Sequence, residues 1–482
     1  MNSMMSQLLI ALPEVFLLTM LCIILLIDAF IPARQRIIIF LLVELTLVFA
    51  FIFTIPQIKD YPNPLVIFNG NYIVDELAII SKLGIYLFSF FAFIYARDYI
   101  KTRNFATSEY YLLGLSAVLG MSIMVSANNF LTIFLGLELQ SLALYTMVAM
   151  YKESRVAPEA AMKFFILGSL ATGLFLYGIS ILYGITGQIQ LDAIAQVLRY
   201  RSDIVPILGL IFVLSGLIFK FGAVPFHMWV PDVYQGAGTP TTLFIASAPK
   251  IAAFAMTVRI LVQAMPSLNV NWEHILIAVS ILSMFFGNVL AIAQSNFKRL
   301  LAYSSIAHIG YTLLGILAGP RSSQGYSAAM FYISTYVLVA GGAFAIISIM
   351  SRDGAELDQL EDYRGLNARN PWLAFMMLLV LFSMAGVPPT VGFFAKLGLI
   401  EALVEGHLVW LAVLALIFAL IGAYYYLRVV MLMYFEEPNT SAVQSITVSR
   451  DMLVAVSLNG AAALLLGLFP SFLIDLCRIS VG

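Results

Sequence analysis

The sequence predicts an all-α membrane protein with about fourteen transmembrane helices. Of its 482 residues, 62% are hydrophobic and only 11% are charged, and the mean hydropathy is +0.97. A soluble domain carries about 25% charged residues, and no water-soluble fold could cover this much apolar surface with polar side chains. Apolar stretches of about twenty residues, the length that crosses a bilayer as a helix, recur from one end of the chain to the other.

The apolar stretches define the expected spans in chain order. They lie near residues 8–28, 36–56, 75–96, 109–126, 129–151, 158–185, 204–224, 238–262, 271–291, 297–318, 325–351, 371–405, 407–435 and 450–478. The stretch 371–405 is too long for one straight crossing, and Pro388 and Pro389 interrupt it. The N-terminus lacks the basic segment and small-residue cleavage site of a signal peptide, so its first apolar stretch is interpreted as a retained helix.

Basic residues in the loops predict the orientation, because they collect on the cytoplasmic side. The loops after the first, third, fifth, ninth and eleventh spans contain Arg34, Arg36, Arg97, Lys101, Arg103, Lys152, Arg155, Lys298, Arg299, Arg352, Arg364 and Arg369. Fewer basic residues lie in the loops on the other side. With an even number of spans, both termini are expected in the periplasm.

Two spans carry an unusual interruption. Small residues and proline stand in or at the end of the seventh span, in Phe219–Pro225, and of the twelfth, in Met384–Pro389. The two are five spans apart, and an odd separation means that two successive five-helix units enter the membrane from opposite sides. Discontinuous helices 7 and 12 at matching places in two inverted five-helix repeats indicate a transport path.

The expected domain organisation follows from these repeats. It comprises an N-terminal three-helix segment (1–108), a first repeat (109–262), a second repeat (263–435) and a C-terminal helix (436–482), with one proton half-channel in each repeat.

Several ionisable residues stand within apolar spans, where a charge costs roughly 2.5–3.5 kcal/mol on insertion scales. They are Glu138, Lys163, Lys220, Lys250 and Lys396. Lysine and arginine side chains near helix ends can extend to the headgroups. We expect this of Arg259 and Arg428, but not of four lysines near the centres of separate helices. A static salt bridge could explain Glu138 and one lysine, but one glutamate cannot neutralise four.

The residue type indicates proton transfer. Burial disfavours the charged form of an amine, so a buried lysine can release its proton near neutral pH. A carboxylate such as Glu138 would favour the charged form of a lysine beside it, and separating the two would release the proton. Lysines joined by water would therefore form a proton path.

Other candidates are less distinctive. His308, with Ser304, Ser305 and Tyr311 nearby, could carry protons or be a hydrogen-bonded core histidine. His227 is a candidate for proton entry at the cytoplasmic edge. Glu44 and Lys82 are expected to pair with each other between the second and third spans, Glu14 to be hydrated, and the tract Arg352–Arg369 to form a solvated loop or a docking surface.

Composition excludes several other functions. Cys22 and Cys477 stand alone near opposite ends of the chain and cannot ligate an iron–sulfur cluster. The four histidines show no haem or zinc spacing, and no basic run suggests nucleic acid.

Four stretches, in the same order, carry a resemblance to a known family. They are FKFGAVPFHMWVPDVYQGAGTPTTLFIASAPKIAAF, QSNFKRLLAYSSIAHIGY, DYRGLNARNP and AGVPPTVGFFAKLGLI. The sequence resembles the antiporter-like subunits of proton-pumping NADH–quinone oxidoreductase (complex I). The Pro-Asp-Val-Tyr-Gln-Gly run and lysine at position 396 are similar to subunit N rather than to subunits L or M. One departure is Gly-Ala-Gly-Thr-Pro, ending at Pro240, where the family usually has Gly-Ala-Pro-Thr-Pro.

The resemblance implies a role for each candidate. Glu138 would modulate Lys220 on the broken seventh helix, Lys163 would be the neighbouring lysine, Lys250 would relay between half-channels, and Lys396 would gate the output.

The resemblance also implies a translocase subunit in a bacterial inner membrane, with a neighbouring antiporter-like subunit and small membrane subunits as partners. NADH, FMN, iron–sulfur clusters and quinone would bind elsewhere in the complex, and none in this chain. The alternatives are a subunit of a multisubunit Na+/H+ antiporter, a stand-alone carrier of small metabolites, and a structural scaffold.

Overall fold

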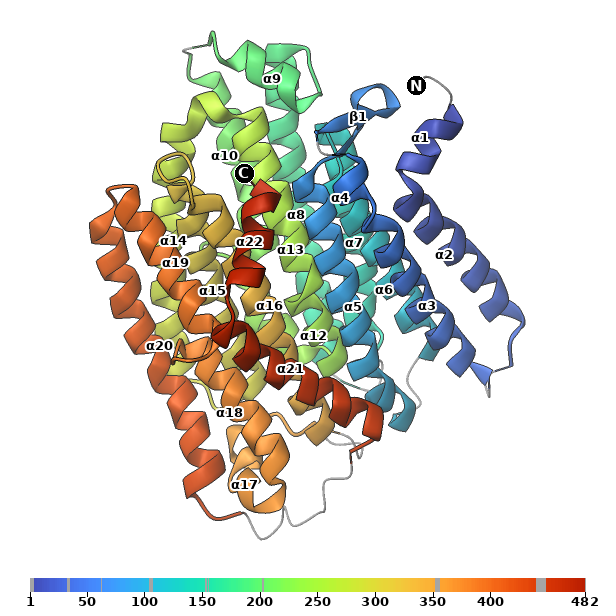
Figure 1. The fold of residues 1–482 in the computed structure, drawn as a ribbon, viewed down its shortest axis with the longest axis vertical. Helices are drawn as coiled ribbons and strands as arrows, with labels where there is room; N and C mark the ends of the chain where they lie inside the picture. The colour runs from blue at the N-terminus through green and yellow to red at the C-terminus, as the bar shows by residue number, and fades with distance from the viewer. Residues whose placement is uncertain are drawn as a thin grey trace.

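The computed structural model shows a mostly helical bundle (Figure 1). It describes residues 4–32, 35–61, 63–103, 107–151, 154, 156–201, 203–351, 356–438 and 448–481. Arg34, Lys152, Arg155 and Arg352, which contributed to the predicted orientation, lie outside these ranges. Both chain ends lie toward the end of the bundle that carries α9 and β1 (Figure 1), as an even number of crossings requires.

The helices of the N-terminal part are α1 (Met4–Ile10), α2 (Leu12–Phe30), α3 (Ile37–Thr54), α4 (Gln57–Asp60), α5 (Glu76–Thr102), α6 (Thr107–Val125), α7 (Phe130–Ala149), α8 (Val156–Thr186) and α9 (Leu191–Leu198). Those of the middle are α10 (Val205–Phe221), α11 (Trp229–Gly236), α12 (Thr239–Ala246), α13 (Ala248–Val258), η3 (Arg259–Ala264), η4 (Pro266–Leu268), α14 (Asn269–Ile292), α15 (Phe297–Ala318) and α16 (Gly325–Met350). The remainder are η5 (Leu360–Tyr363), α17 (Leu366–Arg369), α18 (Pro371–Ala385), α19 (Val391–Glu405), α20 (Val409–Phe435), α21 (Arg450–Leu468) and α22 (Ser471–Val481).

Twelve helical segments of the described residues are long and apolar enough to cross a membrane, and α10 and α18 are shorter apolar helices. The all-helical membrane fold is therefore confirmed. A total of fourteen crossings counts the two interrupted helices as one crossing each, and that number stays a prediction, as does the inverted repeat.

The helices differ in how much of their surface faces other protein. In α15 and α16, 94% and 89% of the residues of the membrane window are buried inside the protein, whereas in α2 the share is 22%. A helix that is apolar on all sides belongs either in a core or against lipid. Here α15 and α16 form the centre, and α2 lies at the edge of the bundle (Figure 1).

Both predicted interruptions are present. Helix α10 ends where Gly222 turns into the left-handed conformation with a φ of 74°, and α18 ends at Gly386 with a φ of 84°. Glycine adopts this conformation without the steric penalty of a Cβ atom. The chain then re-enters helices in α11 and α19, respectively, so each interruption leaves backbone carbonyls at the end of a helix inside the protein.

A third interruption was not predicted. The expected span 238–262 is divided at Ser247, whose φ and ψ of −110° and −109° separate α12 from α13. Pro249 stands in the first turn of α13, where proline is tolerated because its missing N–H has no intrahelical partner.

A small β-hairpin is the one departure from helix among the named elements of the described chain. Strands β1 (Leu65–Ile67) and β2 (Tyr72–Val74) pair antiparallel through the short helix η2 (Phe68–Gly70), and Leu65 lies opposite Val74. The hairpin precedes α5 and positions the Tyr72 side chain against α2 and α5.

Candidate functional site

The ammonium group of Lys220 lies between α7 and α10. Its Nζ donates a hydrogen bond to the Ser141 hydroxyl at 2.9 Å. Both residues line a cavity of about 10 Å³, close to the least space that one water molecule occupies. Glu138 precedes Ser141 by three residues on α7, and residues three apart share a helix face. The Glu138 carboxylate and the Lys220 ammonium bound to Ser141 therefore lie on the same side of α7. The buried Oε1 of Glu138 has no hydrogen-bond partner among the described residues.

Lys250 binds the end of the interrupted helix α10. It is 2% exposed, and its Nζ donates to the carbonyl oxygen of Phe221 at 2.5 Å. The same ammonium lies 5.7 Å from the centre of the Trp229 ring. A helix C-terminus carries a partial negative charge on carbonyls without intrahelical partners, so the interruption itself supplies the acceptor that stabilises this cation.

Lys396 repeats this arrangement at the second predicted interruption. Its Nζ donates to the carbonyl oxygens of Met384, at 3.0 Å, and Ala385, at 2.8 Å, which end α18. The Tyr311 ring lies 5.8 Å away. No carboxylate lies within 4.0 Å of the ammonium groups of Lys250 or Lys396 in the described ranges. Their acceptors are carbonyls inside the protein, which argues against both snorkelling and a static salt bridge.

His308 lies on the central helix α15 within a group of hydroxyls. Nδ1 is 2.8 Å from the Tyr332 hydroxyl and Nε2 is 3.0 Å from the Tyr426 hydroxyl. The Tyr426 hydroxyl is also 2.5 Å from that of Ser304. A cavity of about 10 Å³ is lined by both His308 and Lys396. The histidine is therefore hydrogen-bonded in the core and also adjoins the space around the lysine.

Buried polar groups without protein partners occur on the helices around these residues. In the described chain they include the side-chain amide of Gln140 on α7 and the hydroxyls of Tyr234, Ser305, Thr335 and Ser348 on α11, α15 and α16. Buried polar groups in native proteins are almost always hydrogen-bonded, to water where no protein group is available. These side chains favour a hydrated interior.

The comparisons with known proteins agree with this geometry. Residues 127–422 match the family described as "NADH:quinone oxidoreductase/Mrp antiporter, TM". The chain is 50% identical to NADH-quinone oxidoreductase subunit N of Coxiella burnetii over 474 residues, which is 98% of each chain. It is also 50% identical to that of Thiobacillus denitrificans over 475 residues, 98% of this chain and 97% of the other.

The chain belongs to the NADH-quinone oxidoreductase subunit N family. A chain of respiratory complex I from Thermus thermophilus is 32% identical, with a TM-score of 0.82 over 97% of this chain and 99% of that one. A chain of the Mrp complex from Dietzia sp. DQ12-45-1b is 17% identical, with a TM-score of 0.86 over 99% and 97% of the two chains, and shows likeness of fold alone. In this member of the subunit N family, no group of three or more His, Cys, Asp or Glu side chains in the described residues could hold a metal ion.

Lys163 does not lie at the centre of its helix, and that prediction was wrong. Helix α8 has 31 residues, about 46 Å at 1.5 Å per residue, which is longer than the roughly 30 Å apolar core of a bilayer. Lys163 stands on the second turn with its side chain 45% exposed, and its Nζ pairs with Glu159 at 2.9 Å and Asp232 at 2.8 Å. Asp232 also pairs with Arg299 at 2.9 Å. The sequence did not predict that Asp232 pairs with these basic residues.

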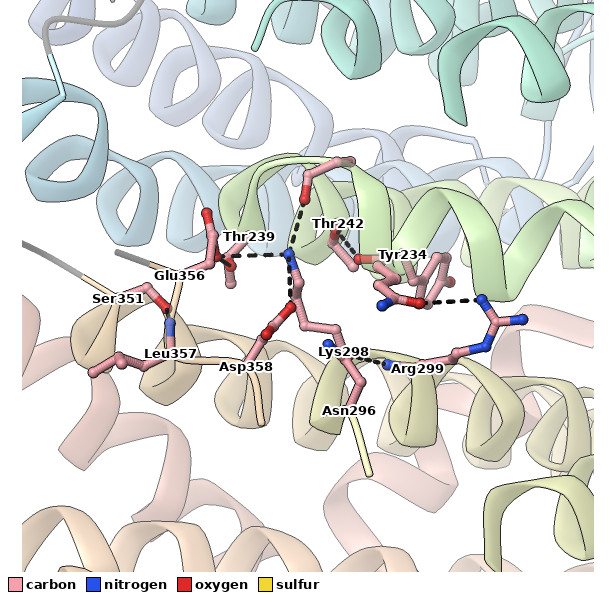
Figure 2. Close-up of polar contacts among 12 residues, drawn as sticks. Tyr234, Thr239, Thr242, Asn296, Lys298, Arg299, Ser351, Glu356, Leu357 and Asp358 are labelled. Carbon is pink, nitrogen blue, oxygen red and sulfur yellow. Dashed lines mark hydrogen bonds and ion pairs between the residues drawn. The ribbon is translucent and has the colours of Figure 1, made fainter. Parts of the chain in front are cut away.

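An ionic cluster ties α12 and α15 to the loop after α16 (Figure 2), and Tyr99 of α5 and Arg103 at its end join the same cluster. Lys298, 1% exposed, donates to the Ala237 carbonyl at 3.0 Å, and its Nζ lies 3.6 Å from Glu356 and 4.0 Å from Asp358. Glu356 accepts hydrogen bonds from Thr239 at 2.9 Å, Arg103 at 3.0 Å and the Tyr99 hydroxyl. Burial raises the pKa of Glu356, but the Lys298 ammonium, the Tyr99 hydrogen bond and Arg103 outweigh it and hold the pKa below its ordinary value.

The tract Arg352–Arg369 is therefore not simply a solvated loop. Glu356 and Asp358 are partly buried in this cluster, whereas Glu361 is exposed. Asp353 lies outside the described residues, and docking by this tract stays a prediction.

The predicted pair Glu44–Lys82 was wrong. Lys82, fully buried on α5, binds Glu14 at 2.9 Å and the Tyr72 hydroxyl at 3.1 Å. Glu14 is only 7% exposed, so its expected hydration was also wrong. Both carboxylate oxygens of Glu44 are buried and have no hydrogen-bond partner in the described part of the chain.

Arg259 also differs from the prediction. Instead of extending to the headgroups, its guanidinium is 2% exposed and binds both carboxylate oxygens of Asp75, at 2.9 Å and 2.6 Å, and the Val125 carbonyl at 2.6 Å. Arg428 is exposed and donates to the Ile292 carbonyl at 3.2 Å. His227 lies in the α10–α11 interruption with its buried Nδ1 unpaired among the described residues, and its role in proton entry stays a prediction.

Proposed function

We propose that this chain moves protons across the membrane as subunit N of a respiratory NADH–quinone oxidoreductase, driven by redox chemistry in other subunits. The observation that carries the proposal is the pair of ammonium groups bound to carbonyls at interrupted helices, Lys250 at the end of α10 and Lys396 at the end of α18. Family membership at 50% identity over nearly the whole chain supports it.

The chemistry of these two sites suits reversible protonation. When either lysine releases its proton, the site retains a neutral amine facing neutral carbonyls, and no buried charge remains without a partner. Lys220 can exchange protons with water beside Ser141, and Glu138 would bias that exchange through its charge. His308 and its tyrosine partners would support water beside Lys396. Lys163, in contrast, would act at the edge of the path through its pairing with Asp232.

The test uses substitutions that keep or remove the charge. Lys250→Arg and Lys396→Arg retain a cation and its hydrogen bonds, but arginine cannot be deprotonated in a protein. Lys250→Met and Lys396→Met remove the charge. We expect both kinds of variant to lower proton transfer through this chain by roughly 10²-fold or more, the contribution usual for a positioned proton-transfer group.

The measurement is NADH-driven acidification of inverted membrane vesicles, with NADH oxidation by an artificial acceptor as the measure of assembled complex. Lys59→Arg and Lys59→Met serve as controls, because Lys59 is exposed on α4. Normal acidification by the two arginine variants would contradict the proposal, since such variants cannot release a proton. It would favour a structural role for both lysines.

The finer features of the assembly are part of the same proposal. The chain would lie in the bacterial inner membrane with both termini in the periplasm and would contact a neighbouring antiporter-like subunit and small membrane subunits. NADH, FMN, iron–sulfur clusters and quinone would bind to other parts of the complex. The units 1–108, 109–262, 263–435 and 436–482 would be the N-terminal segment, the two half-channels and the C-terminal segment. The single helix expected in the last unit is divided into α21 and α22.

A second candidate is a subunit of a multisubunit Na+/H+ antiporter. The matched family includes Mrp antiporters, and the Mrp chain from Dietzia has a TM-score of 0.86. The 50% identity to subunit N of other bacteria favours the respiratory complex. Purification together with NADH dehydrogenase subunits, without Na+ uptake in vesicles, would decide between the two.

A further inference from the structure

A large apolar crevice lies behind the α12–α13 interruption. Its volume is about 580 Å³, and its walls come from α3, α4, α5, α12, α13, α16, α21 and α22. Along α5 the wall extends from Ile80 to Tyr95, about 22 Å at 1.5 Å per residue. This exceeds the roughly 15 Å that one leaflet contributes to a 30 Å hydrocarbon core. The crevice therefore runs along the membrane-spanning part of the bundle.

The walls are mostly hydrocarbon, and the hydrogen-bond donors of three polar residues in them bind backbone carbonyls. The Tyr95 hydroxyl donates to the Ala455 carbonyl at 3.0 Å, and the Ser247 hydroxyl donates to the Phe244 carbonyl at 3.0 Å. The amide nitrogen of Asn459 donates to the Leu338 carbonyl at 3.0 Å. These donors are satisfied by backbone and are not available to orient a polar ligand. Two further polar groups of the wall are the Asn459 Oδ1, which is buried without a hydrogen-bond partner among the described residues, and Ser334, and the rest of the lining is apolar. The crevice thus selects for an apolar occupant.

Size excludes two alternative occupants. To fill the crevice with water would take about twenty molecules at roughly 30 Å³ each, and apolar cavities stay dry. Water is therefore excluded as the occupant. A partner helix is about 10–12 Å across, so one turn of 5.4 Å occupies roughly 400–600 Å³. The crevice would hold little more than one turn of a helix, although its wall is four turns long. A narrow, flexible chain can fill a crevice of this length and volume.

We propose that one acyl chain of a membrane phospholipid occupies this crevice. The surrounding solvent of a membrane-spanning chain is lipid, so the bilayer supplies this occupant directly. Ser247 and Ile251 form part of the wall and flank Lys250 in sequence. The acyl chain packs against the α12–α13 interruption and excludes water from that side of the Lys250 helix, so that the ammonium keeps the Phe221 carbonyl and the Trp229 ring as its partners.

Gly341 provides a way to fill the crevice from within. It lines the wall on α16, and a Cβ atom added there meets nothing within 4 Å. Gly341→Leu should therefore project into the space of the acyl chain. Gly173→Leu is the matched control, because Gly173 is also free of neighbours within 4 Å but lies exposed on α8, outside the crevice.

The experiment uses the assembled complex in vesicles of phosphatidylethanolamine and phosphatidylglycerol that contain some phosphatidylcholine with a photoreactive group in one acyl chain. Mass spectrometry locates the crosslinks. We expect crosslinks at Val337 and Leu473 in the crevice and at the exposed Leu420 on α20. Gly341→Leu should abolish the crosslinks at Val337 and Leu473 and leave that at Leu420, whereas Gly173→Leu should change none.

A second measurement does not require a substitution. Cys477 lines the crevice and is buried, whereas Cys22 is exposed on α2. Stripping lipid from the wild-type complex with detergent should speed alkylation of Cys477 by a membrane-soluble maleimide, and adding back phosphatidylethanolamine should slow it, with Cys22 unchanged.

Three results would overturn the proposal. They are lipid crosslinks confined to Leu420, which would leave a partner helix as the occupant, crosslinks in the crevice that Gly341→Leu does not reduce, and displacement of the photoreactive lipid by a long-tailed quinone, which would assign the crevice to quinone. None of these measurements depends on proton pumping, so they are independent of the proposed function.

Discussion

The buried pair of Glu14 and Lys82 offers a sharp prediction about what holds the N-terminal helices together. The Lys82 side chain is 0% exposed, and its Nζ lies 2.9 Å from a carboxylate of Glu14 that is 8% exposed. The Tyr72 hydroxyl donates to the other oxygen of the same carboxylate at 2.7 Å. Lys82→Met or Glu14→Leu removes one charge and leaves its partner buried without a counterion.

The expected magnitude follows from this burial. Removing one partner of a buried ion pair costs about 3–5 kcal/mol, whereas replacing both by apolar residues is often neutral or stabilising. At 1.4 kcal/mol per tenfold change, a single variant would shift the folding equilibrium by more than about a hundredfold. The loss of stability in Lys82→Met should lie at the lower end of this range, because the Tyr72 hydroxyl still binds the Glu14 carboxylate. The double variant should recover most of the loss.

The assay is a double-mutant cycle on the purified complex, which measures thermal unfolding of this subunit in detergent and the yield of assembled complex. The coupling energy between the two sites should be several kcal/mol. Additive losses, with the double variant as unstable as the sum of the single variants, would refute the reasoning. Acidification of vesicles by the double variant then separates a structural pair, for which pumping survives, from a proton-carrying one.

Two other ion pairs give further predictions. Asp75→Asn should leave the Arg259 guanidinium buried with a neutral partner and cost about 3 kcal/mol, measured as an earlier thermal unfolding transition, and Asp75→Glu should retain part of the stability. Glu356→Gln should cost about 1–3 kcal/mol through loss of charge-assisted hydrogen bonds. Since the pKa of Glu356 is held below its ordinary value, its contribution is complete above the unfolded pKa of about 4.3 and is lost as pH falls toward the folded pKa. Stability of the wild type should thus decline in that acidic range, and Glu356→Gln should remove part of the decline.

Local features of the fold were predictable because their causes are local. Gly222 and Gly386 stand before prolines inside apolar stretches, and the left-handed turn that glycine allows is all that is needed to end a helix there. The interruption at Ser247 was not predicted. A proline such as Pro249 fits the first turn of a helix, so the sequence around it does not show whether one helix ends and another begins there. The place of Lys163 was missed because a 31-residue helix gives no indication of which turns extend beyond the membrane.

Contacts between distant segments could not be predicted. Glu14 and Lys82 are 68 residues apart, and Asp75 and Arg259 are 184 apart. A single sequence shows that a buried charge needs a partner but not which partner the packing brings to it. Glu44 and Lys82 were adjacent in the order of the predicted spans, and this order favoured the wrong pair.

The acceptors of their ammonium groups distinguish Lys82 from Lys250 and Lys396. Lys82 faces a carboxylate, and taking its proton away would leave that negative charge uncompensated in a medium of low dielectric constant. Lys250 and Lys396 face only main-chain carbonyls and aromatic rings, so loss of the proton leaves a neutral site. The proton affinity of an ammonium held by dipoles alone changes with any nearby charge, whereas the ammonium of an ion pair is already neutralised by its partner. Interrupted helices provide such dipoles inside a membrane without adding a charge, which is the physical reason that the ends of α10 and α18 suit the proposed proton path.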